Sequence, residues 1–159
     1  MLSASLDMLE DSLNKKIEVM TQIEKENEAQ RDVLKDADDV DEASFDATVD
    51  RKGELIDKLN LLDDGFEALY ADIKKDLEAE RDQHKEQIAR LQTLIHTIMD
   101  KSASIEAQEH RNKKLAEKYF SVTREKLAAG KKSSSVAFNY YQTMNKFRDI
   151  PPQFMDEKN

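Results

Sequence analysis

The amino-acid sequence predicts an all-α protein: an elongated antiparallel three-helix bundle (up-down-up) with a long third helix and a short C-terminal amphipathic helix. Three observations lead to this prediction. Apolar residues recur at alternating spacings of three and four over most of the chain. The 159 residues include only 3 Gly and 2 Pro, the residues that most disfavour helices. Charged residues make up 37% of the chain, which suits thin helices with solvated outer faces.

The first helix is expected over about residues 2–35. Its seam, the row of residues at alternating spacings of three and four, consists of Leu2, Leu6, Leu9, Leu13, Lys16, Met20, Ile23, Asn27, Gln30 and Leu34. The acidic run 36–42 cannot pack into an apolar core, so it predicts a turn whose acids cap the next helix. These acids do not have the spacing of an EF-hand, because Val40 and Ala47 fall where oxygen ligands are needed. We therefore expect no metal site in this turn.

The second helix is expected over about residues 42–76. Its seam consists of Phe45, Thr48, Lys52, Leu55, Leu59, Leu62, Phe66, Leu69 and Ile73. Gly53 and Gly65 lie inside it and mark either close helix contact or a bend. The hydrophobic pattern lapses over residues 76–83, and a chain reversal is expected near residues 77–82. Without it, the second and third helices would form one rod too long to be stable alone.

The third helix, about residues 82–128, is the element around which the chain is organised. Its seam consists of His84, Ile88, Leu91, Ile95, Ile98, Ser102, Ile105, Glu109, Asn112, Ala116, Tyr119, Thr123 and Lys126. If the first and third helices run parallel, Asn27 and Gln30 lie at the level of Glu109 and Asn112. These four polar residues form either a hydrogen-bonded layer that fixes the register or the point where the bundle frays open.

Gly130 and the serines that follow it predict that the bundle, residues 1–128, ends in a flexible joint over residues 129–135. Residues 136–159 are expected to form an amphipathic helix plus an extended tail. Seven of the ten aromatic residues lie at or after Tyr119. Because so short a helix is marginal in water, this candidate docking segment either folds back onto the bundle or enters a partner's groove.

The charge of the chain is unevenly distributed. Residues 1–109 hold 14 bases against 29 acids, whereas residues 110–132 hold 8 bases against 2 acids. The acidic body argues against nucleic acid as a partner. The basic stretch either offsets the acidic turn inside its own chain or contacts a partner.

Several function classes are excluded by what the sequence lacks. The chain contains no Cys, and its three His residues are not paired at metal-ligand spacing. No Gly-rich phosphate loop, nucleophile elbow or zinc-protease motif is present. We therefore expect no enzyme, with no catalytic residue, no cofactor and no metal. Residues 91–99 are too short and too polar to span a membrane, and no basic leader begins the chain, so a cytoplasmic protein without membrane insertion is expected.

Residues 51–69, with the sequence RKGELIDKLNLLDDGFEAL, resemble the matching helix of the FlgN/FliT-type flagellar export chaperones. Residues 88–94 and 104–113 resemble the same family. The resemblance implies a bacterial cytoplasmic chaperone, monomeric or weakly dimeric. Its partners would be a hook-associated (junction) or filament cap protein, whose C-terminal helical region it binds, and components of the export apparatus.

The resemblance also implies where the partner binds, because substrate contacts in this family gather on the C-terminal helical segment. In this chain the corresponding residues are Tyr119, Val122, Val136, Tyr140, Tyr141, Met144 and Phe147. The alternative hypothesis is a structural coiled-coil or adaptor protein that self-associates through its helical seams. It predicts a stable oligomer whose assembly does not need the C-terminal segment.

Overall fold

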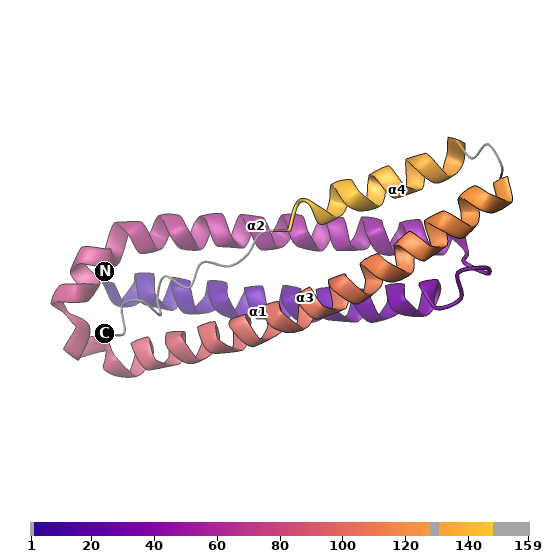
Figure 1. The fold of residues 1–159 in the computed structure, drawn as a ribbon. Helices are drawn as coiled ribbons and strands as arrows, with labels where there is room; N and C mark the ends of the chain where they lie inside the picture. The colour runs from indigo at the N-terminus through magenta and orange to yellow at the C-terminus, as the bar shows by residue number, and fades with distance from the viewer. Residues whose placement is uncertain (1, 128–130, 148–159) are drawn as a thin grey trace.

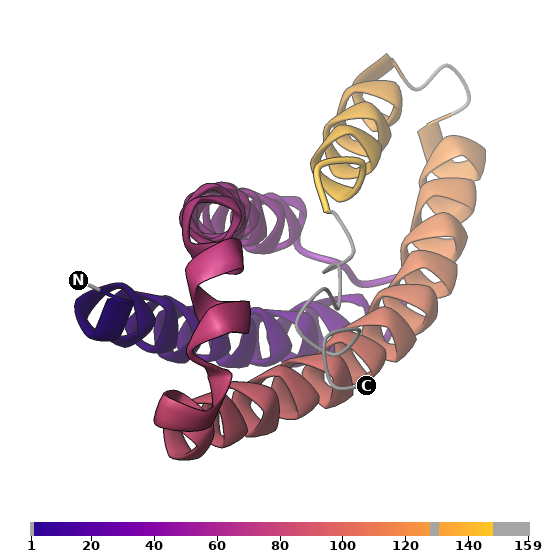
Figure 2. The same cartoon turned by 90° about the vertical axis from the view of Figure 1, so that its left-hand side faces the viewer.

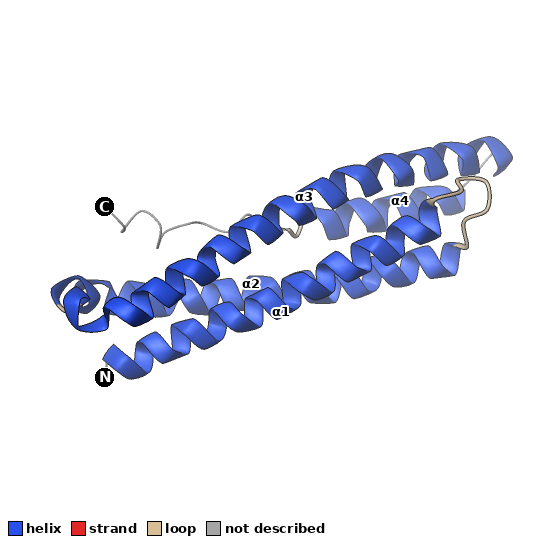
Figure 3. Cartoon of the chain, turned by 90° about the horizontal axis from the view of Figure 1, so that it is seen from below, coloured by secondary structure: helices blue, strands red, loops and turns tan. Residues whose placement is uncertain are grey.

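The computed structural model describes residues 2–127 and 131–147. They form the helices α1 (Leu2–Leu34), α2 (Glu42–Ala79), α3 (Lys85–Leu127) and α4 (Lys131–Met144), with a short 3₁₀ helix, η1 (Arg81–His84), between α2 and α3. Successive long helices run in opposite directions (Figure 1). The described residues contain helices and loops and no strand, which confirms the predicted all-α class for this part of the chain (Figure 3). The prediction was a bundle of three helices with a separate C-terminal segment, whereas four helices pack together in the described part of the chain.

The helix ends differ from the prediction mainly at the second reversal. α2 continues to Ala79, and α3 begins at Lys85, with η1 filling the corner. No Gly or Pro marks this corner. The helix ends where Glu80 leaves the helical region (φ −111°, ψ 20°), while its N–H still bonds the Asp76 carbonyl at 3.0 Å. At the other end of α2, Asp41 caps the helix by accepting a hydrogen bond from the Ser44 N–H at 3.2 Å.

The fourth helix begins earlier than expected. Residues 131–135, predicted as part of a flexible joint, belong to α4. No Gly or Pro lies between Lys131 and Met144, and contact with the bundle supplies the packing that so short a helix lacks alone. Gly130 and the predicted extended tail lie outside the described residues.

α1 packs along both α2 and α3. α3 crosses α1 obliquely and diverges from α2 toward its own C-terminal end (Figures 1 and 2). α4 lies at this divergent end and packs on both α2 and α3. None of the described helices is long and apolar enough to cross a membrane.

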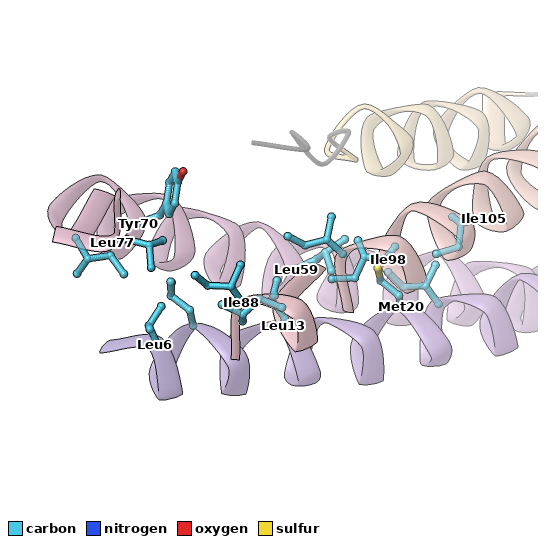
Figure 4. Close-up of a cluster of buried hydrophobic side chains, with 14 of the residues drawn as sticks. Leu6, Leu13, Met20, Leu59, Tyr70, Leu77, Ile88, Ile98 and Ile105 are labelled. Carbon is cyan, nitrogen blue, oxygen red and sulfur yellow. The ribbon is translucent and has the colours of Figure 1, made fainter. Parts of the chain in front are cut away.

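The ten seam residues predicted for the first helix are the ten buried residues of α1. All of their apolar members except Leu34 form a long core with side chains of α2 and α3, part of which is shown in Figure 4. Met20 of α1, Leu59 of α2 and Ile98 of α3 are each 0% exposed there. Burial of such side chains contributes about 1.5–3 kcal/mol each, so this stripe stabilises the long helices against the cost of ordering them.

The buried face of α2 departs from the predicted seam in its second half. Asp63 and Tyr70 are buried, whereas Leu62 and Leu69 are only half-buried. A straight helix has about 3.6 residues per turn, so a row of residues that repeats every 3.5 positions gradually rotates around the helix. A different row of residues therefore faces the core in the second half of α2. Lys16, 3% exposed on α1, forms a buried ion pair with Asp63. A buried ammonium needs an acid beside it, so this rotation also satisfies Lys16.

A layer of polar side chains divides the core of the protein. Its buried members are Asn27, Gln30, Thr48, Lys52 and Asn112, each 0% or 1% exposed. Asn112 Nδ2 donates to Gln30 Oε1 at 3.1 Å and to the Asn27 carbonyl at 2.9 Å. Of the two alternatives for these seam positions, the hydrogen-bonded layer is therefore the one observed, and it fixes the register of α1 against α3.

Lys52 lies at the centre of this polar layer. Its Nζ donates to Glu109 Oε1 at 2.6 Å and to Gln30 Oε1 at 3.3 Å. Burial lowers the pKa of Lys52, and the neighbouring Glu109 carboxylate opposes that shift. One side chain of α2 thus joins α1 and α3 through charge-assisted hydrogen bonds.

The basic stretch and the acidic turn meet in the folded chain. Lys126 Nζ donates to the Asp38 carbonyl at 2.9 Å and lies 3.8 Å from the Asp38 carboxylate. Both side chains are more than half exposed, so this pair contributes little free energy.

We predict that Lys52→Met lowers the free energy of unfolding by about 3 kcal/mol, because it leaves the Glu109 carboxylate buried without its cation. Adding Glu109→Gln, which removes the unpaired charge, should restore most of the lost free energy of unfolding. Lys15→Met is the matched control, since Lys15 is 61% exposed in a surface pair with Asp11. Urea denaturation of the four proteins checks the prediction. A loss below about 1 kcal/mol for Lys52→Met would contradict a structural role for the pair.

Candidate partner-binding site

The structure places the seven predicted partner-binding residues on or near the contact between α3 and α4. Three of them, Tyr119, Val136 and Tyr140, are buried. The other four are half-buried: Val122, Tyr141, Met144 and Phe147. Residues 131–147 are folded back onto the bundle, and α4 packs against side chains of α1, α2 and α3, among them Leu34, Phe45 and Phe120.

Five of the seven residues come together in one aromatic cluster, which also contains Leu34, Phe45, Val49, Ala116 and Phe120. Phe147 packs instead against the long apolar core. The centre of the cluster is the Tyr140 ring, whose centroid lies 5.8 Å from that of Phe45 and 6.0 Å from that of Phe120. Such ring distances are typical of favourable aromatic pairs.

Phe45 and Phe120 were not among the residues predicted from the sequence for this site. Phe120 follows the seam residue Tyr119 directly, and that adjacency of two aromatic residues could have indicated a wider buried face. Phe45 lies at the start of α2, and no local pattern connects it with Tyr140. Only the three-dimensional packing shows that α2 supplies the floor on which α4 rests.

α2 and α4 pass close together at Gly53. A Cβ atom added there would lie 3.5 Å from Thr143 Cγ2, an ordinary van der Waals distance, so a small side chain would also fit at this position. Gly65 has nothing within 4 Å of an added Cβ atom. Beside Gly53, Lys52 Nζ lies 3.5 Å from Met144 Sδ. The polar layer and α4 are therefore in direct contact.

Two polar atoms under α4 have no hydrogen-bond partner among the described residues: the Tyr140 hydroxyl and Glu109 Oε2. Tyr140 is 1% exposed. Burial raises the pKa of Tyr140 well above its ordinary value, and the Glu109 charge adds to that rise. The next residue differs, because the Tyr141 hydroxyl donates to Glu117 Oε2 at 3.2 Å.

A groove of about 610 Å³ runs between α3 and α4. Its lining residues are Ala103, Glu106, Ala107, Glu109, His110 and Lys113 of α3 and Tyr140, Tyr141, Met144 and Asn145 at the end of α4. We call it the α3–α4 groove. Phe138 is 68% exposed and lies three residues before Tyr141, so it extends the same face of α4. Phe138 was not among the residues predicted from the sequence.

The chemistry of this region is that of a binding surface. Apolar and aromatic side chains form the walls, and a few polar groups are available to orient a ligand. Among the described residues, no group of three or more His, Asp or Glu side chains is placed to hold a metal ion.

The buried tyrosines predict a loss of stability at alkaline pH. An unfolded tyrosine ionises near 10.0, whereas folded Tyr140 keeps its proton to higher pH. Above that pH the folded state binds more protons than the unfolded state, so its stability falls as the pH rises. Tyr140→Phe should therefore lose less stability than the wild type between about pH 8 and about pH 11. Urea unfolding at both pH values measures the difference, and equal losses in the two proteins would contradict the prediction.

Comparison with known proteins shows to which protein family the chain is related. The family model described as FlgN protein matches residues 1–145, a range that contains all four helices. No curated protein and no solved structure matches the chain. Since the family model covers most of the sequence, the chain belongs to the FlgN family.

Proposed function

We propose that this protein is a cytoplasmic export chaperone of the bacterial flagellum. It binds the C-terminal helical region of an axial protein, a hook–filament junction protein or the filament cap protein. It thereby prevents premature assembly and delivers this client to the flagellar export apparatus. The observation that carries the proposal is the match to the FlgN family over residues 1–145.

In this proposal the helices have different roles. α1, α2 and α3 serve as an up-down-up scaffold, and the chain from residue 136 onward serves as the docking segment. The seven residues named above form the client-binding region together with Phe138. Within it, the buried Tyr119 and Val136 hold α4 on the bundle, and the more exposed side chains contact the client. A binding protein of this kind needs no catalytic residue and no cofactor.

The packing of the C-terminal region supports this assignment. Tyr141 and Met144 line an open groove although their neighbours are buried, so they offer apolar contact area on a surface that the fold already holds in place. Tyrosine buries a large area at small entropy cost, and methionine adapts to uneven surfaces. Such residues are typical of the energetically dominant contacts in protein interfaces.

We predict that the full chain forms a 1:1 complex with the C-terminal helical fragment of a junction or cap protein. Tyr141→Ala should weaken this complex by at least about tenfold, because an aromatic anchor is removed. The matched control is Leu61→Ala on α2, since Leu61 is 75% exposed and lies outside the proposed region. It should leave the affinity unchanged.

Size-exclusion chromatography with light scattering gives the stoichiometry, and calorimetry gives the affinities. Absence of a complex with every junction and cap fragment, together with a stable oligomer of the chain alone, would refute the proposal. Such a result would favour a self-associating coiled-coil protein.

A further inference from the structure

This inference rests on the proposed function and specifies how the client is recognised. We propose that the client helix lies in the α3–α4 groove while α4 stays docked, and that it presents an Asn or Gln side chain to the Tyr140 hydroxyl and Glu109 Oε2. The partner is thus an amphipathic helix whose apolar face carries one neutral amide.

Two unpaired polar atoms belong to residues that line the same groove. The Tyr140 hydroxyl and Glu109 Oε2 have no partner among the described residues, and both side chains line the groove. Tyr140 is 1% exposed, so its hydroxyl has lost its contact with bulk solvent. Buried polar groups are almost always paired, and an orphaned one destabilises the protein. A ligand that supplies the missing hydrogen bonds therefore gains affinity and specificity from them.

The shape of the groove suits a helix. Its floor includes Ala103 and Ala107, which are both exposed and one helical turn apart. Such small side chains allow the backbone of another helix to approach closely. The groove extends along α3 from Ala103 to Lys113, or roughly 15 Å at 1.5 Å per residue. That length matches about three turns of a helix laid against it, and Tyr141 and Met144 form the opposite wall.

The charges beside the groove favour a neutral ligand group. Glu109 already pairs with Lys52 through Oε1 at 2.6 Å, so a second cation at Oε2 would also face the Lys52 ammonium. A neutral amide avoids this repulsion. Its NH₂ group carries two donors, and Glu109 Oε2 and the Tyr140 oxygen can each accept one of them. Its carbonyl can accept the Tyr140 hydroxyl proton instead.

Met144 is the side chain that such an amide has to move. Its sulfur lies 3.5 Å from Lys52 Nζ, and the same side chain lines the groove. Met144 therefore lies between the polar layer and the groove. Its three rotatable bonds let the end of the side chain swing aside without displacing α4.

The test fixes α4 in place. The chain contains no Cys, and an added Cβ atom at Gly53 lies 3.5 Å from Thr143 Cγ2 and 3.9 Å from Thr143 Oγ1, so a γ sulfur at position 143 would lie beside it, as a disulfide requires. The double variant Gly53→Cys/Thr143→Cys should bind the C-terminal fragment of the junction or cap protein equally well when oxidised and when reduced. Binding by the reduced form and at least tenfold weaker binding by the oxidised form would show that α4 has to leave, and would overturn the inference. No binding by the wild type would instead refute the proposed function.

Two single variants test the groove without relying on the disulfide. Ala107→Gln fills the floor of the groove and should weaken client binding at least tenfold. Ala71→Gln, at an exposed position of α2 outside the groove, should have no effect. Unchanged affinity of Ala107→Gln would overturn the inference.

Tyr140→Phe tests the polar contact itself. This variant keeps the buried ring and removes only the hydroxyl. It should bind the client about three- to tenfold more weakly, while its unfolding midpoint at neutral pH stays the same or rises. A purely structural role for Tyr140 would not give this combination. Unchanged affinity of Tyr140→Phe would overturn the assignment of the amide contact.

Discussion

The burial of one ammonium group constrains much of this structure. Lys52 is charged, yet it is 0% exposed because it lies on the face of α2 that packs inside the protein. Its charge is satisfied only if α1 brings Gln30 and α3 brings Glu109 to the same level. A buried charge without these partners would cost several kcal/mol, so alternative registers of the helices are disfavoured. The polar layer thus sets how the three long helices align, which the apolar stripe alone specifies less strictly.

The polar layer separates two regions of the core that differ in composition. Toward the N-terminus of α1 the core is mainly aliphatic, and α1 packs against both of its neighbours. Toward the end of α3 the core becomes aromatic, and Leu34 at the end of α1 meets side chains of α2, α3 and α4 there. The contact between Lys52 and Met144 joins the two regions. The candidate site is therefore built on the most specific part of the scaffold, and the groove takes its shape from the docked position of α4.

The sequence predicted the long helices well, because their seams repeat over many turns. The buried residues of α1 agree with the prediction throughout, and the hydrogen-bonded layer was one of two stated alternatives. The corner after Ala79 was placed a few residues early, because no Gly or Pro marks it. The docked position of α4 could not be predicted, since it depends on contacts such as Lys52 with Met144, 92 residues apart in the chain. For the same reason the roles of Phe45, Gly53 and Thr143 became visible only in the fold.

The central claim is that a client helix is recognised by α3 and α4 together, with α4 in its docked position. Hydrogen–deuterium exchange of the full chain, with and without the bound C-terminal fragment of a junction or cap protein, tests this claim most directly. The account predicts slower exchange on binding in residues 103–113 and in α4, with no segment of α4 exchanging faster. Faster exchange in α4 on binding, or protection confined to α1 and the first half of α2, would contradict it.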